Sequence, residues 1–238
     1  MIVSHPNNVK DSNRAAFIYF ALTGDNSLNL DPYNQPIQFL EEYPINIYSW
    51  SLPGHGPELD EKEAMKFWYE MWKKGNDPIT PFLQDSIKNI DQLISQNEFD
   101  PQKIAIGGLS RGGYASLRLA ALDSRIKYIV GYAPLTSPSR LDEFGGEVFA
   151  PIENEIDKLV QKNIWLSIGN ADTRVGTELA FQFVHKLALK NIDMGVRSPQ
   201  VELHVKPSIG YRGHGTSPDT FKQGIEWLVK QFKLERGS

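Results

Sequence analysis

Residues 103–121, KIAIGGLSRGGYASLRLAA, constrain the fold more than any other part of the chain. The segment begins with an apolar run at 104–106, typical of a strand buried on both faces, and from Ala115 it continues in good helix formers. Glycines at 107, 108, 112 and 113 lie between the two parts, with Ser110 at the vertex. Glycine permits a sharp turn and close packing of the backbone. The pattern predicts a strand–turn–helix that presents one hydroxyl at the mouth of a sheet, at a helix N-terminus.

Short apolar runs of high β-propensity alternate with segments long enough for helices along the rest of the chain. The expected strands are 15–22, 45–52, 103–107, 127–133, 163–168 and 201–205. Apolar residues recur at helical spacing in 78–96, 175–189 and 217–232. Near-continuous apolar strands that alternate with helices predict an α/β fold, a mostly parallel sheet of about six strands with helices on both faces.

The length of 238 residues favours a single domain over 1–238, and the sequence shows no internal repeat. Two segments do not fit as connections between strands, 58–76 and 135–160. Both follow expected strands at the edge where open α/β sheets bind ligands, so we expect small cap-like segments there. The aromatic side chains of an expected amphipathic helix at 58–74 also fit an ordinary core.

A serine hydroxyl is nearly inert at neutral pH, so Ser110 needs a base. His55 and His214 occupy identical Gly-His-Gly triplets. In a sheet with this kind of turn, the reacting groups follow the order Ser, Asp or Glu, His. His214 follows the last expected strand on a glycine-flanked loop, whereas His55 precedes Ser110. His185 and His204 fall inside an expected helix and strand. We therefore predict His214 as the base.

A carboxylate is needed to hold the imidazole in one tautomer and to stabilise the imidazolium that forms. Asp172 lies on the loop after the fifth expected strand, in Gly-Asn-Ala-Asp and a few residues before a helix, and it is the acid we favour. The alternative is that Asp172 only caps that helix. Four rival carboxylates follow the fourth expected strand: Asp142, Glu143, Glu153 and Asp157.

The negative charge that develops on a substrate oxygen needs two donors aimed at it, usually backbone N–H groups. The amide of Arg111, the residue after Ser110, is one candidate, because it begins a helix whose dipole favours negative charge. We place the other on the loop after the first expected strand, at the amide of Leu22, with the amide of Thr23 as the next candidate. Losing one such donor typically costs ~3 kcal/mol of transition-state stabilisation.

The composition narrows the classes of partner and cofactor. A formal net charge of −4 gives no reason to expect nucleic acid. The chain has no cysteine, no basic-then-apolar leader and no apolar run near ~18 residues. We therefore expect a cytoplasmic protein without membrane insertion. Scattered histidines and the lack of a phosphate-loop motif predict no metal and no cofactor, while the oligomeric state stays open.

Four motifs in this order resemble the α/β-hydrolase superfamily over residues 15–232. They are SLPGHG at 51–56, GGLSRGGY at 107–114, GNADTRV at 169–175 and GHG at 213–215. The likeness is greatest to prolyl-oligopeptidase-like and dienelactone-hydrolase-like serine hydrolases. Three departures exist: Phe20-Ala21 replaces the usual His-Gly, the N-terminal strands of the full fold are reduced, and the cysteine nucleophile of the dienelactone hydrolases proper is absent.

The resemblance implies a serine hydrolase in which Ser110, His214 and Asp172 form a catalytic triad and an acyl-enzyme forms. We favour a small-molecule ester or acyl substrate, because alcohols leave more easily than amines and no anchor for a peptide terminus is visible. Two alternatives remain open. One is a peptidase of the prolyl-oligopeptidase-like type, and the other is a non-catalytic binding protein on the same scaffold.

Overall fold

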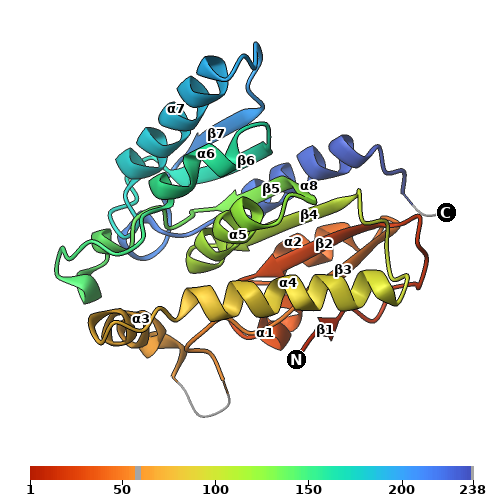
Figure 1. The fold of residues 1–238 in the computed structure, drawn as a ribbon, viewed down its shortest axis with the longest axis horizontal. Helices are drawn as coiled ribbons and strands as arrows, with labels where there is room; N and C mark the ends of the chain where they lie inside the picture. The colour runs from red at the N-terminus through yellow and green to blue at the C-terminus, as the bar shows by residue number, and fades with distance from the viewer. Residues whose placement is uncertain (57–59, 237–238) are drawn as a thin grey trace.

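The computed structural model describes residues 1–56 and 60–236. Its sheet contains seven strands within those residues, in the spatial order β1-β3-β2-β4-β5-β6-β7 (Figure 1). Their bounds are β1 Val3–Ser4, β2 Ala15–Phe20, β3 Ile45–Ser49, β4 Ile104–Leu109, β5 Ile126–Tyr132, β6 Asn163–Gly169 and β7 Val201–Lys206. Only β1 runs antiparallel to its neighbour. The predicted α/β class with a mostly parallel sheet is confirmed, and β1 is the strand beyond the six expected.

The central strands are apolar on both faces, so helices cover both faces of the sheet. Every residue of β2 is buried, and its side chains alternate between two apolar clusters. Ala16, Ile18 and Phe20 belong to one cluster, and the residues between them belong to the other. Strands that are apolar on both faces need helices on both sides, as parallel sheets require.

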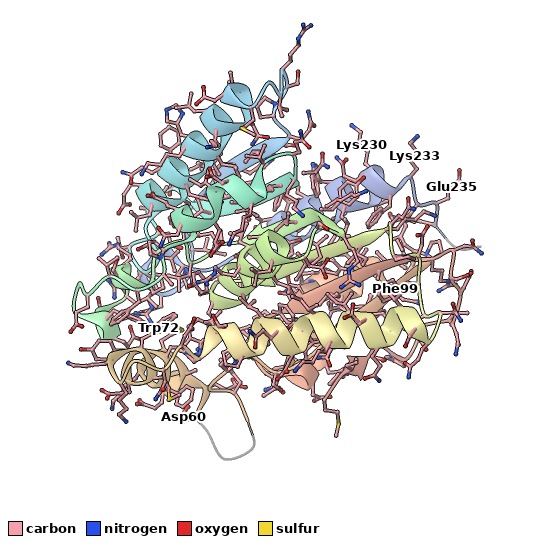
Figure 2. All side chains as sticks on the ribbon, in the orientation of Figure 1. Asp60, Trp72, Phe99, Lys230, Lys233 and Glu235 are labelled. Atoms are coloured by element: carbon pink, nitrogen blue, oxygen red, sulfur yellow. The ribbon has the colours of Figure 1, made fainter. Side chains whose placement is uncertain are left out.

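The helices divide into two layers. Helices α3 (Ala64–Lys73), α4 (Ile79–Ser95), α5 (Arg111–Leu122), α6 (Ile156–Leu159) and α7 (Thr177–Asp193) pack on one face. Helices α1 (Gly24–Asn29), α2 (Gln35–Leu40) and α8 (Pro218–Phe232) pack on the other. In Figure 1, α4 and α5 lie in front of the strands and α8 lies behind them. Trp72 and Phe99, buried residues labelled in Figure 2, lie at the two ends of α4.

The segments predicted as caps form short elements. Part of the predicted helix at 58–74 lies outside the described residues, and the rest is a 3₁₀ turn, η1 (Glu61–Glu63), followed by α3. Residues 135–160 contain three more 3₁₀ turns, η2 (Pro138–Arg140), η3 (Asp142–Phe144) and η4 (Ile152–Glu155), and then α6. The two segments meet through aromatic rings, with Trp72 stacked on Phe149 at 5.7 Å between ring centroids. The division of the chain into a single domain stays a prediction.

Candidate active site

Ser110 occupies a strained turn between β4 and α5. Its backbone has φ 56° and ψ −115°, a conformation that L-residues rarely adopt. Strain of this kind costs of order 1–3 kcal/mol and persists only where neighbours enforce it. Two hydrogen bonds, one to the last residue of β5 and one to the segment after it, do so: the Ser110 N–H donates to the Tyr132 carbonyl at 2.9 Å, and the Leu135 N–H donates to the Ser110 carbonyl at 3.0 Å.

The glycines around Ser110 are required by close backbone packing. A Cβ atom on Gly108 would clash with the backbone of Gly112, and one on Gly112 would clash with the carbonyl of Phe20 at the end of β2. A Cβ on Gly113 would lie 2.8 Å from the side chain of Pro134. These contacts bring the start of α5 against β2 and β5, so that Ser110 stands above the C-terminal ends of the strands.

Three side chains that are distant in the sequence meet at this edge. The Ser110 Oγ lies 2.9 Å from His214 Nε2, and His214 Nδ1 lies 2.7 Å from Asp172 Oδ2. An ionised carboxylate only accepts hydrogen bonds, so His214 Nδ1 carries the proton and Nε2 presents a lone pair to the Ser110 hydroxyl. The structure therefore brings together the three residues that the sequence predicts as nucleophile, base and acid.

Asp172 is held in place by its own loop. Its Oδ1 atom accepts from the Arg174 N–H at 2.9 Å and from the Val175 N–H at 3.0 Å, while Oδ2 faces His214. The Asp172 side chain is fully buried. Asp172 does not cap α7, whose N-cap residue is Gly176; one of its oxygens closes a turn within its own loop, and the other contacts the imidazole.

The histidine loop between β7 and α8 is fastened to the acid loop. A 3₁₀ turn, η5 (Tyr211–Gly213), precedes His214, and Arg212 within it has φ 56°. The Thr173 N–H donates to the Arg212 carbonyl at 2.9 Å, which links the two loops directly. Gly215 closes the loop by donating its N–H to the Ile209 carbonyl at 2.8 Å.

The two predicted oxyanion donors differ in their surroundings. Arg111 is the first residue of α5, where backbone N–H groups lack partners within the helix. Leu22 is buried, and its N–H donates to Ser27 Oγ at 3.1 Å. The same Oγ accepts from the Ala21 N–H at 3.0 Å and donates to the Thr23 carbonyl at 2.7 Å. In this structure the Leu22 amide is therefore bound to Ser27, and its assignment stays a prediction.

A cavity of about 500 Å³ opens beside Ser110 and His214. The cap segments contribute to its wall, as do Pro32 and Tyr33 in the turn between α1 and α2. The lining residues are Pro32, Tyr33, Lys62, Met65, Leu109, Ser110, Arg111, Leu135, Leu141, Arg174, Tyr211, His214, Gly215, Thr216 and Phe221. The lining is mostly apolar but includes three cationic side chains, Lys62, Arg111 and Arg174.

His55, the histidine of the first Gly-His-Gly triplet, is not part of this contact chain. Its ring is buried, and Nδ1 lies 3.1 Å from the Pro53 carbonyl, which fixes the proton on Nδ1. Burial, together with the nearby charge of Arg111, lowers the pKa of His55 to about 4. His55 is therefore a neutral residue at physiological pH.

The rival carboxylates bind arginine or lysine side chains. Glu143 makes two hydrogen bonds with the Arg174 guanidinium, at 2.7 and 2.5 Å, which raise the pKa of Arg174. Asp142 pairs with Arg212, and this hydrogen bond lowers the pKa of Asp142. Glu153 and Asp157 pair with lysines of α7. Sequence reasoning considered these carboxylates only as acids, because chain order does not show which basic side chains they meet.

Two further properties follow from the residues described. Within them, no three His, Asp or Glu side chains gather as a group that could hold a metal ion. None of the helices in the described part of the chain is both long and apolar enough to cross a membrane.

The sheet order, the turn at Ser110 and the histidine loop define an α/β hydrolase. A comparison with protein families agrees, because residues 46–202 match the dienelactone hydrolase family. The chain therefore belongs to the dienelactone hydrolase family, within the superfamily that the sequence motifs resemble, and it is a hydrolase. The suspected resemblance is confirmed at this level. No curated protein matches the chain.

Solved structures with similar folds include esterases and a peptidase. The Pyrococcus furiosus esterase Pf2001 superposes with a TM-score of 0.67 at 17% identity, covering 93% of this chain and 84% of that one. Est1E from Butyrivibrio proteoclasticus, solved with ferulic acid, gives 0.68 at 15% identity, covering 98% and 94%. Prolyl oligopeptidase B from Galerina marginata gives 0.64 at 19% identity, covering 99% of this chain but 35% of that one. At these identities the likeness concerns the fold alone.

Proposed function

We propose that this protein is a serine hydrolase that cleaves a small carboxylic ester. The observation that carries the proposal is the continuous contact from Ser110 Oγ through His214 to Asp172 Oδ2, at 2.9 and 2.7 Å, beside a cavity of about 500 Å³. A hydroxyl bound to a neutral imidazole, itself held by a buried carboxylate, is the arrangement that activates serine as a nucleophile.

In the proposed mechanism, Ser110 Oγ attacks the ester carbonyl carbon while His214 Nε2 takes its proton. Asp172 stabilises the imidazolium through Nδ1. The imidazolium then donates a proton to the leaving alcohol as the C–O bond breaks, which leaves an acyl group on Ser110. Water attacks this acyl-enzyme with His214 as base, and the carboxylic acid departs as the Ser110 hydroxyl is restored.

The oxyanion of each tetrahedral intermediate needs donors on the side of α5. The Arg111 N–H, at the first position of that helix, is the first proposed donor. Leu22 is the second, and it would exchange its 3.1 Å bond to Ser27 Oγ for the oxyanion. Ser27 would keep its bonds to the Ala21 N–H and the Thr23 carbonyl, so the loop would retain its shape.

The ester assignment rests on the cavity and on the chemistry of leaving groups. A space of about 500 Å³ suits a small molecule. An alkoxide is a better leaving group than an amide anion, so an ester depends less than a peptide on protonation by His214. The similarity to the fold of a prolyl oligopeptidase keeps a peptidase as the second candidate. A binding protein without catalysis is the third, and it requires Ser110 to be unreactive.

Turnover of p-nitrophenyl acetate and butyrate by wild type and Ser110→Ala tests the proposal, with fluorophosphonate labelling in parallel. We expect Ser110→Ala to lose labelling and to lose at least ~10³-fold in kcat. Ser95→Ala, on the exposed side of α4, is the matched control and should keep both. Labelling with hydrolysis of peptide anilides but not of esters would favour the peptidase. A wild type that neither labels nor turns over would favour the binding protein.

A further inference from the structure

The turn η3 joins the cap segments to both loops that carry the proposed base and acid. Its first two residues are carboxylates that point to different loops. Asp142 pairs with Arg212 of the histidine loop, and Glu143 binds Arg174 of the acid loop through two hydrogen bonds. The Glu143 and Arg174 side chains are only 24% and 22% exposed, so solvent and salt screen this pair less than an exposed one.

The third residue of η3 anchors the turn. Phe144 is fully buried. Its ring lies 5.6 Å from that of Tyr69 and 5.8 Å from that of Trp72, both on α3, and 6.0 Å from that of Phe149. Aromatic packing of this extent makes the turn a fixed point against which the two carboxylates can hold the loops.

The two arginines each lie two residues from a member of the proposed triad. The Arg174 N–H donates to Asp172 Oδ1 at 2.9 Å, so the position of Arg174 bears directly on the acid. Arg212 adopts the left-handed region at φ 56°, a conformation that is strained for a residue with a Cβ atom. A left-handed residue two positions before His214 needs external contacts to hold it, and Asp142 supplies one beside those made with Thr173.

We propose that Asp142 and Glu143 are positioning residues that hold His214 and Asp172 in line with Ser110. The inference rests on the proposed function for its effect on rate. Removal of both carboxylate charges would take away the Glu143 partner of Arg174 and leave Arg212 held through Thr173 alone, so the histidine loop could relax from its strained conformation. A displacement of about 1 Å at a reacting group lowers rates by as much as ~100-fold.

The same cap segment provides a matched control. Glu153 in η4 pairs with Lys186 of α7 at 2.8 Å, and its side chain is 36% exposed. This ion pair also joins the cap segment to the rest of the molecule but does not reach either triad loop. If the ion pairs of this segment were purely structural, Glu153→Gln and Glu143→Gln would have the same effect on kcat.

The test compares the double variant Asp142→Asn/Glu143→Gln with wild type and with Glu153→Gln on p-nitrophenyl butyrate. We expect the double variant to lose between about 10- and 100-fold in kcat, with KM within about threefold. Glu153→Gln should keep wild-type kcat. Wild-type kcat should fall as NaCl rises from about 0.05 to 1 M, because the Asp142 side chain is 70% exposed and its pair with Arg212 is open to screening, while the double variant should show no such dependence. Equal kcat in all three proteins, or a loss confined to thermal stability, would overturn the proposal.

Two further measurements separate this inference from the proposed function. The NMR resonance of the His214 Nδ1 proton reports its bond to Asp172 without any turnover. We expect this resonance in wild type and in Glu153→Gln, and we expect exchange with water to remove it in the double variant. If the resonance survived in the double variant, the inference would be overturned even if the protein had no esterase activity. Arg212→Gly should keep more kcat than Arg212→Ala, because glycine adopts the left-handed region freely. A higher kcat in Arg212→Ala than in Arg212→Gly would contradict the proposed role of backbone strain at Arg212.

Discussion

Asp172 uses its two carboxylate oxygens for two different neighbours. Oδ1 accepts the N–H groups of its own loop, and Oδ2 accepts from His214. The first set of bonds fixes the direction of the second. We therefore expect Asp172 to act on the imidazole through its charge and also through its geometry.

Asp172→Asn should separate the two contributions. An amide can present an N–H to His214 Nδ1, and that would move the ring proton to Nε2, where it blocks removal of the Ser110 proton. We expect kcat on p-nitrophenyl butyrate to fall by ~10⁴-fold. Asp219→Asn, at an exposed carboxylate in the first turn of α8, should leave it unchanged. A loss of less than about tenfold in Asp172→Asn would mean that Asp172 does not orient the base.

His55 should make folding stability depend on pH. The unfolded chain binds a proton on a histidine at about pH 6.5, whereas the buried ring has a pKa of about 4. Between these values the unfolded state holds more protons, so the free energy of unfolding falls as pH falls. We expect His55 to account for ~2 kcal/mol of the loss between about pH 7 and 4.5.

Urea unfolding of wild type and His55→Asn at the two pH values measures this contribution. Asparagine can place its amide N–H near the position of Nδ1, so that the bond to Pro53 is retained without a group that titrates in this range. The variant should lose less stability than wild type on acidification. Equal losses in the two proteins would show that His55 is accessible to protons when folded.

The sequence predicts residues of this site well where chain order carries the information. His214 and Asp172 follow their strands on loops, and the structure places both beside Ser110. The sequence predicts a site residue's role poorly where that role depends on which distant group its polar atoms bind. Nothing in the segment YFALTGDNS indicates that Ser27 binds the Leu22 amide, and Asp142 and Glu143 give no sign of which arginines they meet. Those contacts depend on how distant loops fold over one another.

At the scale of elements, the junction of β4 and α5 depends on Gly112. A Cβ atom on Gly112 would clash with the carbonyl of Phe20, and this backbone group cannot move aside as a flexible side chain can. We expect Gly112→Ala to lower the free energy of unfolding by at least ~3 kcal/mol and to displace α5, with the Arg111 amide, from Ser110. Chemical denaturation measures the loss. Gly56→Ala, where a Cβ meets nothing within 4 Å, should differ from wild type by less than ~1 kcal/mol; similar values for the two variants would contradict the packing argument.

Periodicity predicts the long elements closely because burial repeats along them. The helices expected at 78–96 and 217–232 correspond to Ile79–Ser95 and Pro218–Phe232. Strand β1 escapes prediction because two residues carry no period, and only pairing with β3 defines it. The segment 135–160 escapes for a related reason: its 3₁₀ turns are fixed by contacts such as that of Phe144 with α3, which no local pattern encodes.

For the whole molecule, one sheet separates two apolar cores. Leu117 on α5 belongs to the core with α3, α4 and α7, and Leu228 on α8 belongs to the core with α1 and α2. Both side chains are fully buried. Every central strand contributes side chains to each core, so neither helix layer can detach without exposing the face of a strand that the other layer still needs.

We therefore expect the chain to unfold as one cooperative unit, as a single domain would. Leu117→Ala and Leu228→Ala should each lower the free energy of unfolding by about 2–5 kcal/mol, within the same transition and without a change of denaturant slope. Tryptophan fluorescence samples both cores, because Trp68 lies in one and Trp165 in the other, and its transition should coincide with that of circular dichroism. Leu122→Ala, at a side chain that is 45% exposed, should cost far less. If the fluorescence and dichroism curves separated, or if one variant split the transition in two, the layers on the two faces of the sheet would be independent folding units.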